Sequence, residues 1–274
     1  MRPILSSALP SVLPRVLPGV LPSFVAVLCL VMVLPVAIVA VLAFSGGTFL
    51  RFPPPSWSLR WFAAFFGDPR WRASLWSSLE IGGIACVAAT FAGFLAAYAL
   101  VRGTFRGKQL VLSLGLLPII APTIITSIAL YYASARLGLV GNIVWIGLCH
   151  AVLALPVVLL ILLSTLQGVD PQLERAALSL GSSRARTMWT VTVPLALPGI
   201  VSAALFAFLA SFDELVVALF LTDVRTQTLP VHIWNSLHLE VEPTIAAVSA
   251  FLVAVTATVL AIDALLRHRG GTEA

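Results

Sequence analysis

The sequence predicts an all-α integral membrane protein with six transmembrane helices and one long polar connection between the fourth and the fifth. Of the 274 residues, 60% are hydrophobic and 10% are charged, whereas a soluble domain carries about a quarter charged residues. The apolar residues form blocks of about 20, and at 1.5 Å per residue each block can cross a hydrocarbon core of about 30 Å. The blocks lack the ten-residue alternation of a membrane β-barrel, so we expect them to be helical.

The predicted spans cover residues 24–45, 75–101, 110–132, 143–166, 194–221 and 244–266. Residues 1–23 are expected to form a proline-containing cytoplasmic tail before an uncleaved anchor, because the following apolar run is too long for a cleaved signal. Residues 24–266 would form the transmembrane domain, with a polar cytoplasmic loop at 167–193, and residues 267–274 a second cytoplasmic tail. The longest external loop, 46–72, is predicted to be an extended segment at the membrane surface.

Three prolines lie inside predicted spans, where each removes a backbone hydrogen-bond donor. They are Pro118 and Pro122 in the third span and Pro156 in the fourth. Helix breaks of this kind are tolerated where neighbouring helices or a water-filled path satisfy the freed carbonyl groups. Two interpretations stay open here, a simple packing kink and a break that lines a solute pathway.

The basic residues predict an orientation rather than a nucleic-acid partner. The formal net charge is +5, but in so apolar a chain the basic side chains belong to loops, where their excess marks the cytoplasmic side. With both termini in the cytoplasm, the inner face holds more of them, which favours an inner-membrane protein of that orientation. The inner set is Arg2, Arg15, Arg102, Arg106, Lys108, Arg175, Arg184, Arg186, Arg267 and Arg269, and the outer set is Arg51, Arg60, Arg70, Arg72, Arg136 and Arg225.

No pattern in the chain predicts catalysis, a metal site or a bound cofactor. Residues 102–109 have three residues between their glycines and Gln109 after the lysine, so they do not make a phosphate-binding loop, and we interpret them as a basic turn. The cysteines lack metal-ligand spacing and are expected to be small buried hydrophobic residues: Cys29, Cys86 and Cys149. The isolated histidines are expected at ordinary interfacial positions: His150, His232, His238 and His268.

The polar loop between the fourth and fifth spans carries the most specific signal. Asp170 is placed to cap a helix whose first residue is Pro171, and Gly181 can adopt the left-handed conformation that ends it. Ser182 or Ser183 can then cap a second short helix that continues through Trp189 into the fifth span. The sequence therefore predicts a short helix, a glycine elbow and a second helix on the cytoplasmic face.

These residues resemble the signature of the permease family of binding-protein-dependent ABC importers. That signature is Glu-Ala-Ala, three residues, Gly, nine residues, Ile, one residue, Leu-Pro. Here the pattern is Arg175-Ala176-Ala177, then Gly181, then Val191-Thr192-Val193-Pro194, with the spacing met throughout. The resemblance implies the type I permease fold, with this loop as the coupling helix that docks on a separate ATPase subunit through Glu174, Arg175, Ala176, Ala177, Gly181 and Pro194.

Arg175 is the main departure from the family pattern, since it stands where the family has glutamate. Glu174 lies one position earlier. One residue rotates a side chain by about 100° around a helix, so Glu174 is not expected to replace the missing contact. Arg175 would then need a matching acidic group on the ATPase.

Two adjacent acids inside the fifth span, Asp213 and Glu214, predict a pathway for a cation. Charged groups at that depth cost at least a few kcal/mol unless they face a cavity or a partner. The alternative is a structural acid held by Ser211, Tyr132 or a neighbouring helix, and we expect it to apply to one of the two. The external loops add a mildly acidic mouth: Asp223, Glu240 and Glu242 against Arg225.

The segments Ala96–Arg102, Ser211–Glu214 and Thr228–Pro230 look most like the spermidine/putrescine subgroup. The resemblance therefore implies a permease for a polyamine-like solute. It would work with a second permease subunit, two ATPase subunits that use the ATP, and an external binding protein. Other cargo, such as an oxyanion or iron, remains open. Two other classes stay possible: an ion-coupled secondary transporter, which leaves the signature unexplained, and a membrane enzyme, for which no catalytic cluster is visible.

Overall fold

A computed structural model describes residues 13–239 and 243–270, which are almost entirely helical. The predicted all-α fold is confirmed. The helices are α1 (Leu13–Ala43), α2 (Arg60–Gly67), α3 (Pro69–Arg102), α4 (Lys108–Ile120), α5 (Thr123–Leu137), α6 (Ile143–Gly168), α7 (Pro171–Ser179), α8 (Arg184–Thr187), the π-helix η1 (Met188–Thr192), α9 (Val193–Phe212), α10 (Val216–Leu221), α11 (Leu229–Leu239) and α12 (Thr244–Gly270).

Within the described residues, five helical segments are long and apolar enough to cross a membrane, and the bent pair α4 and α5 brings the number to six. The chain divides into two compact parts, Met1–Phe62 with Glu242–Ala250, and Ala63–Val241 with Phe251–Ala274. Helix α12 contributes to both parts. The six-span prediction therefore holds, although two of the predicted spans are interrupted.

The first part consists mainly of α1 and the loop that follows it. Helix α1 begins at Leu13, which lies within the predicted tail 1–23, and residues 1–12 of that tail lie outside the described residues. The following loop folds back on itself, because the amide of Gly46 donates to the carbonyl of Ser56 at 2.8 Å and the amide of Ser58 to that of Phe44 at 2.8 Å. The expectation of an extended segment over 46–72 was wrong beyond Leu59, where α2 and then α3 begin.

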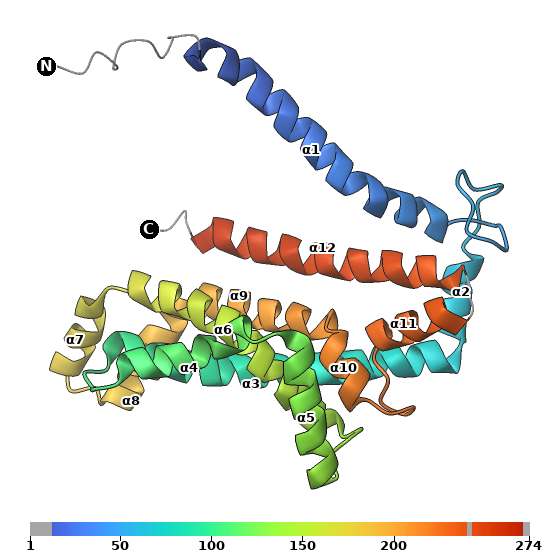
Figure 1. The fold of residues 1–274 in the computed structure, drawn as a ribbon. Helices are drawn as coiled ribbons and strands as arrows, with labels where there is room; N and C mark the ends of the chain where they lie inside the picture. Colours follow the sequence, from blue (N-terminus) through green and yellow to red (C-terminus); the bar gives the residue numbers. More distant parts are fainter. Residues whose placement is uncertain (1–12, 240–242, 271–274) are drawn as a thin grey trace, which may run out of the picture. The chain divides into compact units, whose positions relative to one another are not determined.

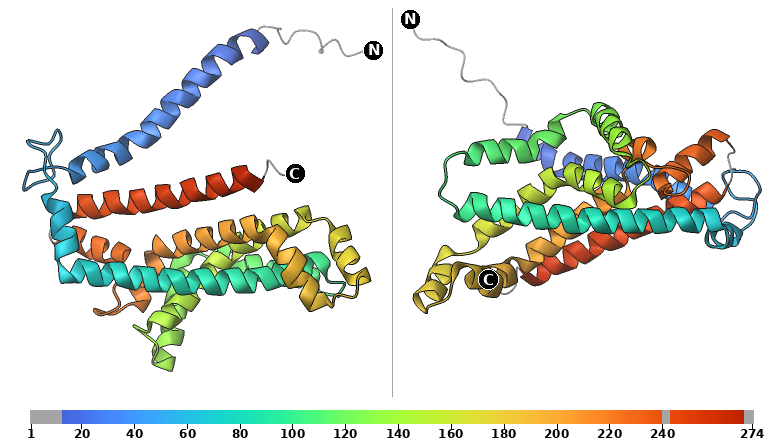
Figure 2. Two further views of the ribbon diagram at one scale, coloured as in Figure 1. Left: turned by 180° about the vertical axis from the view of Figure 1, so that it is seen from behind. Right: turned by 90° about the horizontal axis from the view of Figure 1, so that it is seen from below.

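The second part has a core of three helices, α3, α6 and α9, which pack against one another and run side by side in Figures 1 and 2. Their contact faces are built from small residues, which let helix backbones approach closely in a membrane. A side chain at Gly93 would meet Val158, and one at Gly199 would meet Thr165. The small buried residues are Ala85, Ala89 and Ala97 of α3, Ala151 and Ala154 of α6, and Ala196, Ala203 and Ala207 of α9.

The predicted third span is broken in two. Helices α4 and α5 meet at an angle of 102°, and α5 turns away from the bundle in Figure 1. The break falls at Ala121 and Pro122, not at Pro118, which lies inside α4. Ala121 is extended, as expected for a residue before proline, and Pro122 lacks the amide that would continue the helix. Pro156 is accommodated inside a continuous α6.

The predicted fifth span is interrupted as well, because α9 ends at Phe212 and the short α10 begins at Val216. Its other end is continuous, since α8, η1 and α9 follow one another without a gap. Helices α7 and α8 lie at one end of the bundle, beside the connection from α3 to α4, and α11 lies at the other end beside the start of α3 (Figures 1 and 2). Functional side chains therefore gather at two places, the end that carries α7 and the break after α9.

Candidate functional site

The polar loop forms the predicted elbow, which we define as residues 170–192. Asp170 Oδ1 accepts a hydrogen bond from the amide of Gln172 at 2.8 Å, and Pro171 is the first residue of α7. Gly181 has φ of 88°, a left-handed conformation that glycine adopts at no steric cost. Ser183 Oγ then accepts from the amide of Arg186 at 3.3 Å and caps α8. The predicted caps and turn are therefore confirmed.

A buried ion pair locks the elbow to the bundle. Arg102 Nε, at the end of α3, donates to both carboxylate oxygens of Glu174 at 3.1 and 3.0 Å. Thr192 Oγ1 donates to Glu174 Oε1 at 2.9 Å, and Arg102 Nη2 donates to the carbonyl of Val169 at 2.8 Å. Glu174 therefore ties α7 to the end of α3 and to the start of the fifth span.

The outer surface of the elbow is apolar and basic. Arg175, Ala176 and Gly181 are exposed, and Ala177 is half-buried. Pro194, which lies just beyond the elbow in α9, is exposed as well. Glu174, by contrast, turns into the chain, as the rotation of one residue led us to expect, and its carboxylate is occupied by Arg102 and Thr192. Exposed apolar side chains surround Arg175, Arg184 and Arg186 on this end, namely Leu173, Leu178, Leu180 and Trp189.

The second place is the helix break, residues 213–215, where Glu214 caps α10. Its Oε1 accepts from the amides of Val216 and Val217 at 3.0 Å each, and its Oε2 accepts from the amide of Ala218 at 3.0 Å. A carboxylate at this position accepts hydrogen bonds from amides that an interrupted helix leaves without carbonyl partners. Its negative charge also interacts favourably with the positive end of the helix dipole. One of the two acids is thus held by backbone groups.

A buried histidine bridges the same break from α6. His150 has a fully buried side chain, its Nδ1 lies 2.8 Å from Ser211 Oγ at the end of α9, and its Nε2 lies 3.6 Å from Glu214 Oε2. The interfacial position predicted for His150 was therefore wrong. The missed signal was the one histidine of the fourth span, since a polar group at membrane depth needs a polar partner and Ser211 of the fifth span could supply it.

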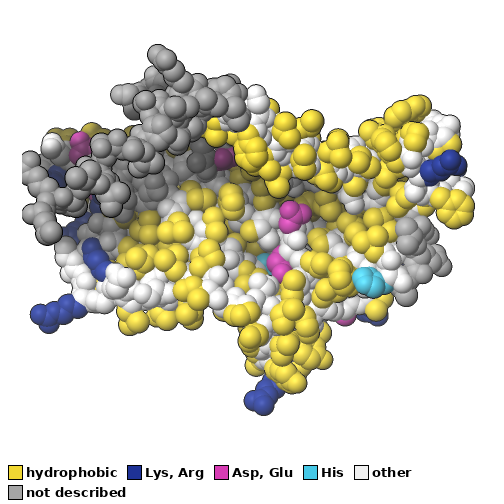
Figure 3. Space-filling view, turned by 45° about the horizontal axis from the view of Figure 1, so that its top comes forward, with side chains coloured by type: hydrophobic (Ala, Val, Ile, Leu, Met, Phe, Trp, Pro, Cys, Tyr) yellow, Lys and Arg dark blue, Asp and Glu magenta, His cyan; other side chains and the backbone are white. Residues whose placement is uncertain are grey.

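Asp213 has different surroundings from its neighbour. It is exposed, while Glu214 is half-buried, so the two adjacent acids do not share one environment. Figure 3 shows acidic side chains within a largely hydrophobic face. An exposed carboxylate at the depth of a membrane-spanning segment needs water, a cation or a partner beside it.

The predicted acidic mouth is described only in part. Asp223 Oδ1 accepts from Thr226 Oγ1 at 2.8 Å, and this hydroxyl is the largest cause that holds the pKa of Asp223 below its ordinary value. Glu240 and Glu242 lie outside the described residues.

Of the cysteines, Cys149 is buried as predicted and Cys86 is half-buried, but Cys29 is exposed on α1, so that part of the prediction was wrong.

Comparison with known proteins gives a consistent family. The model of the "Binding-protein-dependent transport system inner membrane component" family matches residues 89–270. The putrescine transport system permease protein PotI of Escherichia coli (strain K12) is 30% identical over 203 residues, which cover 72% of this chain and 72% of PotI. The molybdenum transport system permease protein ModB of the same strain is 34% identical over 179 residues, 60% of this chain and 78% of ModB.

Among solved structures, a bacterial ABC transporter involved in the import of the acidic polysaccharide alginate has a similar fold. One of its chains superposes with a TM-score of 0.71 at 15% sequence identity, covering 96% of this chain and 99% of that chain. At this identity the likeness shows the fold alone. The three similar proteins carry chemically different cargo, which leaves the cargo of this chain to be argued from its own residues.

Proposed function

Because this chain belongs to the family of binding-protein-dependent transport system inner membrane components and has the type I permease fold, we propose that it is a pathway-forming permease subunit of an ATP-driven importer for a polyamine-like cation. It would pair with a second, similar or identical permease subunit. Two cytoplasmic ATPase subunits and an external binding protein would complete the transporter. The chain itself would catalyse no reaction.

The observation that carries this proposal is the locked elbow with its outward surface. Asp170 caps α7, Gly181 follows its end and Ser183 caps α8. Glu174 then fixes α7 to α3 through Arg102 and to η1 through Thr192. A rigid block of this kind transmits a push from a docked ATPase to the spans, whereas a loosely attached loop would absorb it. Leu180 and Trp189, with exposed fractions of 89% and 61%, would fill a cleft on that ATPase.

Charge on the elbow suggests what the ATPase surface must offer. Arg175 replaces the glutamate of the family pattern, and Arg184 and Arg186 add two further exposed positive charges. A partner with acidic groups around an apolar cleft would complement this surface, because complementary charge steers association and fixes its register. The elbow would then face the cytoplasm, which places both termini there in a six-span inner-membrane protein.

The proposed cargo rests on the helix break. Asp213 is exposed and carries a negative charge beside apolar spans, which suits an ammonium group and opposes an oxyanion. Glu214 is committed to the amides of α10, so it shapes the break and adds negative charge without being free to pair fully with a solute. PotI, whose name states putrescine transport, supports the same cargo class.

The coupling part of the proposal is tested by changing the elbow without touching the spans. Gly181→Pro and Ala177→Trp should leave the chain inserted but reduce ATP-driven uptake at least tenfold, because proline cannot adopt the left-handed conformation and tryptophan keeps the ATPase surface away. Leu137→Trp, at an exposed position on α5, is the matched control for added bulk. Normal uptake and normal co-purification of the ATPase in both elbow variants would refute docking at this surface.

The cargo part is tested with the reconstituted transporter in vesicles. Uptake of radiolabelled putrescine should require ATP and the binding protein, and Asp213→Asn should reduce it while Asp213→Glu retains most of it. Uptake that continues without any ATPase would identify a secondary transporter instead. ATP-dependent uptake of molybdate but not of amines would reject the cationic cargo and keep the permease assignment.

A further inference from the structure

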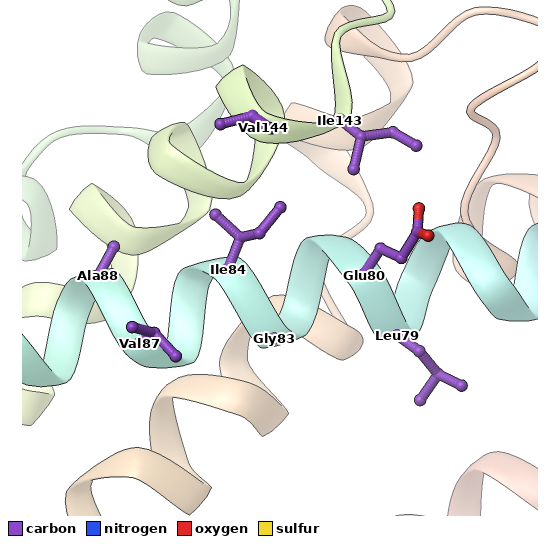
Figure 4. A pocket seen from close by; sticks show the side chains of 8 residues that line it. All are labelled: Leu79, Glu80, Gly83, Ile84, Val87, Ala88, Ile143 and Val144. Atoms are coloured by element: carbon purple, nitrogen blue, oxygen red, sulfur yellow. The ribbon is translucent and has the colours of Figure 1, made fainter.

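A groove with one acidic side chain lies between α3 and the start of α6, apart from the elbow and the helix break. Its volume is about 920 Å³, and Figure 4 shows the side chains that line it. Apart from Glu80, every side chain in its wall is uncharged, including Ile84 and Val87 of α3 and Ile143 and Val144 of α6. In Figure 4 the carboxylate of Glu80 points to the side of α3 where Ile143 lies.

Glu80 has no fixed partner in the part of the chain that the structure describes, since its carboxylate makes neither a hydrogen bond nor an ion pair there. It is half-buried and lies 12 residues after the cap Asp68, about 18 Å into α3. Glu80 is also five residues, or about 8 Å, inside the predicted span 75–101. An unpaired carboxylate on an apolar wall there is unfavourable, so its position is typical of a group that meets a cation during function.

The space in the groove is found beside Gly83. A side chain at Gly83, one turn after Glu80, would meet nothing within 4 Å, whereas one at Gly147 of α6 would collide with Ile84. The two helices are therefore pressed together at Gly147 and leave space beside Gly83. This space adjoins Glu80, so a ligand in the groove can reach both the carboxylate and the apolar wall.

The groove lies in line with the helix break along one face of α6. Ile143, at the groove, and His150, at the break, are seven residues apart and so share a face of that helix, about 10 Å apart along its axis. Ile81, next to Glu80, packs in one cluster with Val217 of α10. Glu80 and the acids Asp213 and Glu214 therefore follow one another along α6, between α3 and α10.

We propose that the groove at Glu80 binds an alkylammonium solute before it reaches the helix break. The carboxylate of Glu80 pairs with an ammonium group, and the aliphatic wall formed by Ile84, Val87 and Ile143 contacts the methylene chain. An anion would be repelled by Glu80, and a lipid tail would leave the carboxylate unpaired. An alkylammonium solute therefore fits the groove better than either of them. This inference rests on the proposed function, because it names a second subsite for the same class of cargo.

Cysteine chemistry in the assembled transporter tests the groove directly. Gly83→Cys places a thiol in the open space, where it can react with a cationic or an anionic thiosulfonate reagent. The reaction rate of the parent chain, which has only the natural cysteines, is measured in the same way and subtracted. The cationic reagent should react about five to ten times faster, because the carboxylate lies one turn away. Adding Glu80→Gln should abolish the preference, and Glu80→Asp should retain it. Putrescine should slow the reaction at least threefold, but not when Glu80 is glutamine.

Three results would overturn the inference: no reaction with either reagent, equal rates for the two reagents, or no protection by putrescine. The first means that lipid or a second subunit covers the groove, the second that Glu80 does not select cations, and the third that putrescine does not bind beside Gly83. The outcome is distinct from a failure of the proposed function. If putrescine uptake is ATP-driven but the thiol shows no charge preference, only the groove inference fails. If no amine is taken up, the proposed cargo fails whatever the thiol shows.

Discussion

The elbow and the helix break each hold a glutamate between helices, but they satisfy it in opposite ways. Glu174 meets a positive charge, Arg102, and a hydroxyl, so three segments are joined through side chains. Glu214 meets three backbone amides of the helix that it begins, with His150 as the side chain beside it. The elbow is therefore held by side chains from distant parts of the chain, whereas the carboxylate at the break is held mainly by the backbone amides that follow it directly.

This difference suits the work proposed for each region. A part that transmits force should not deform, and breaking one partner of a buried pair is among the most destabilising changes in proteins. A part that lets a solute pass should change shape at little free-energy cost. The break suits this requirement, because α10 is short and is capped by Glu214, which stands just before it in the chain. Changes at the elbow are therefore expected to have larger effects than equivalent changes at the break.

The largest effect is expected for Glu174→Ala, because it leaves Arg102 without its counter-charge in a site where the two side chains are only 12% and 16% exposed. The expected loss in stability is about 3 kcal/mol, the lower end of the range for a broken buried pair. Thermal unfolding in detergent measures the loss, and ATP-driven uptake should fall at least tenfold.

Two further variants sharpen this prediction. Arg106→Ala removes an exposed arginine from the connection between α3 and α4. It should change neither the stability nor the ATP-driven uptake. Glu174→Gln keeps an oxygen for Thr192 but loses the charge, so its melting temperature should fall between those of the alanine variant and the parent. A Glu174→Ala chain that unfolds and transports like the parent would show that the pair does not fix the elbow.

An intermediate effect is expected at the break, where the two adjacent acids should separate stability from transport. Glu214→Ala removes the acceptor of three amides and should cost about 1–2 kcal/mol, as for other helix caps. Asp213→Ala should leave the unfolding temperature unchanged, because its side chain is exposed, yet it should reduce uptake of an amine. Equal effects of the two variants on both measurements would contradict the division of roles.

The same comparison explains what the sequence could predict. The elbow follows local rules, since an acidic cap, a first-position proline and a left-handed glycine each act within a few residues, and these features agree with the structure. The break was not predicted. It depends on the Glu214 side chain, which accepts hydrogen bonds from the amides of the next helix, and on His150, which comes from another span. The apolar block 194–221 predicted one continuous helix, because Asp213 and Glu214 are its only charged residues and apolar residues stand on both sides of them.

The third span gives the same lesson for proline. Both Pro118 and Pro122 were candidates for a break, and only Pro122 ends a helix. Pro118 stays inside α4, where the loss of one hydrogen bond is tolerated. The local rule therefore predicted that a break was possible, but not its place or its angle of 102°, because α4 packs on α6 and α5 on α10, which are contacts between distant parts of the chain.

The smallest effect is expected at the end opposite the elbow, where α11 is attached to α3 by His232. Its ring stacks on Trp71 with centroids 3.8 Å apart, and its Nδ1 lies 2.9 Å from Ser74 Oγ. Burial is the largest cause that lowers the pKa of His232 from its ordinary value of 6.5, and Arg70 lowers it further while Asp68 opposes them. The neutral ring is thus the form that the folded state favours.

The stability contributed by neutral His232 is present above pH 6.5, the ordinary value of its pKa, and is lost as the pH falls below it, because the detached state gains the proton first. The protection of the α11 amides, which is the intrinsic exchange rate divided by the observed rate at the same pH, should therefore fall by about two- to fivefold between pH 7 and pH 5 for a half-buried group. His232→Phe keeps an aromatic ring for Trp71 but cannot titrate, so its exchange should show only the intrinsic pH dependence of amides. If the parent chain behaves like the phenylalanine variant, protonation of His232 does not govern the attachment of α11, and the stacking on Trp71 suffices to hold it.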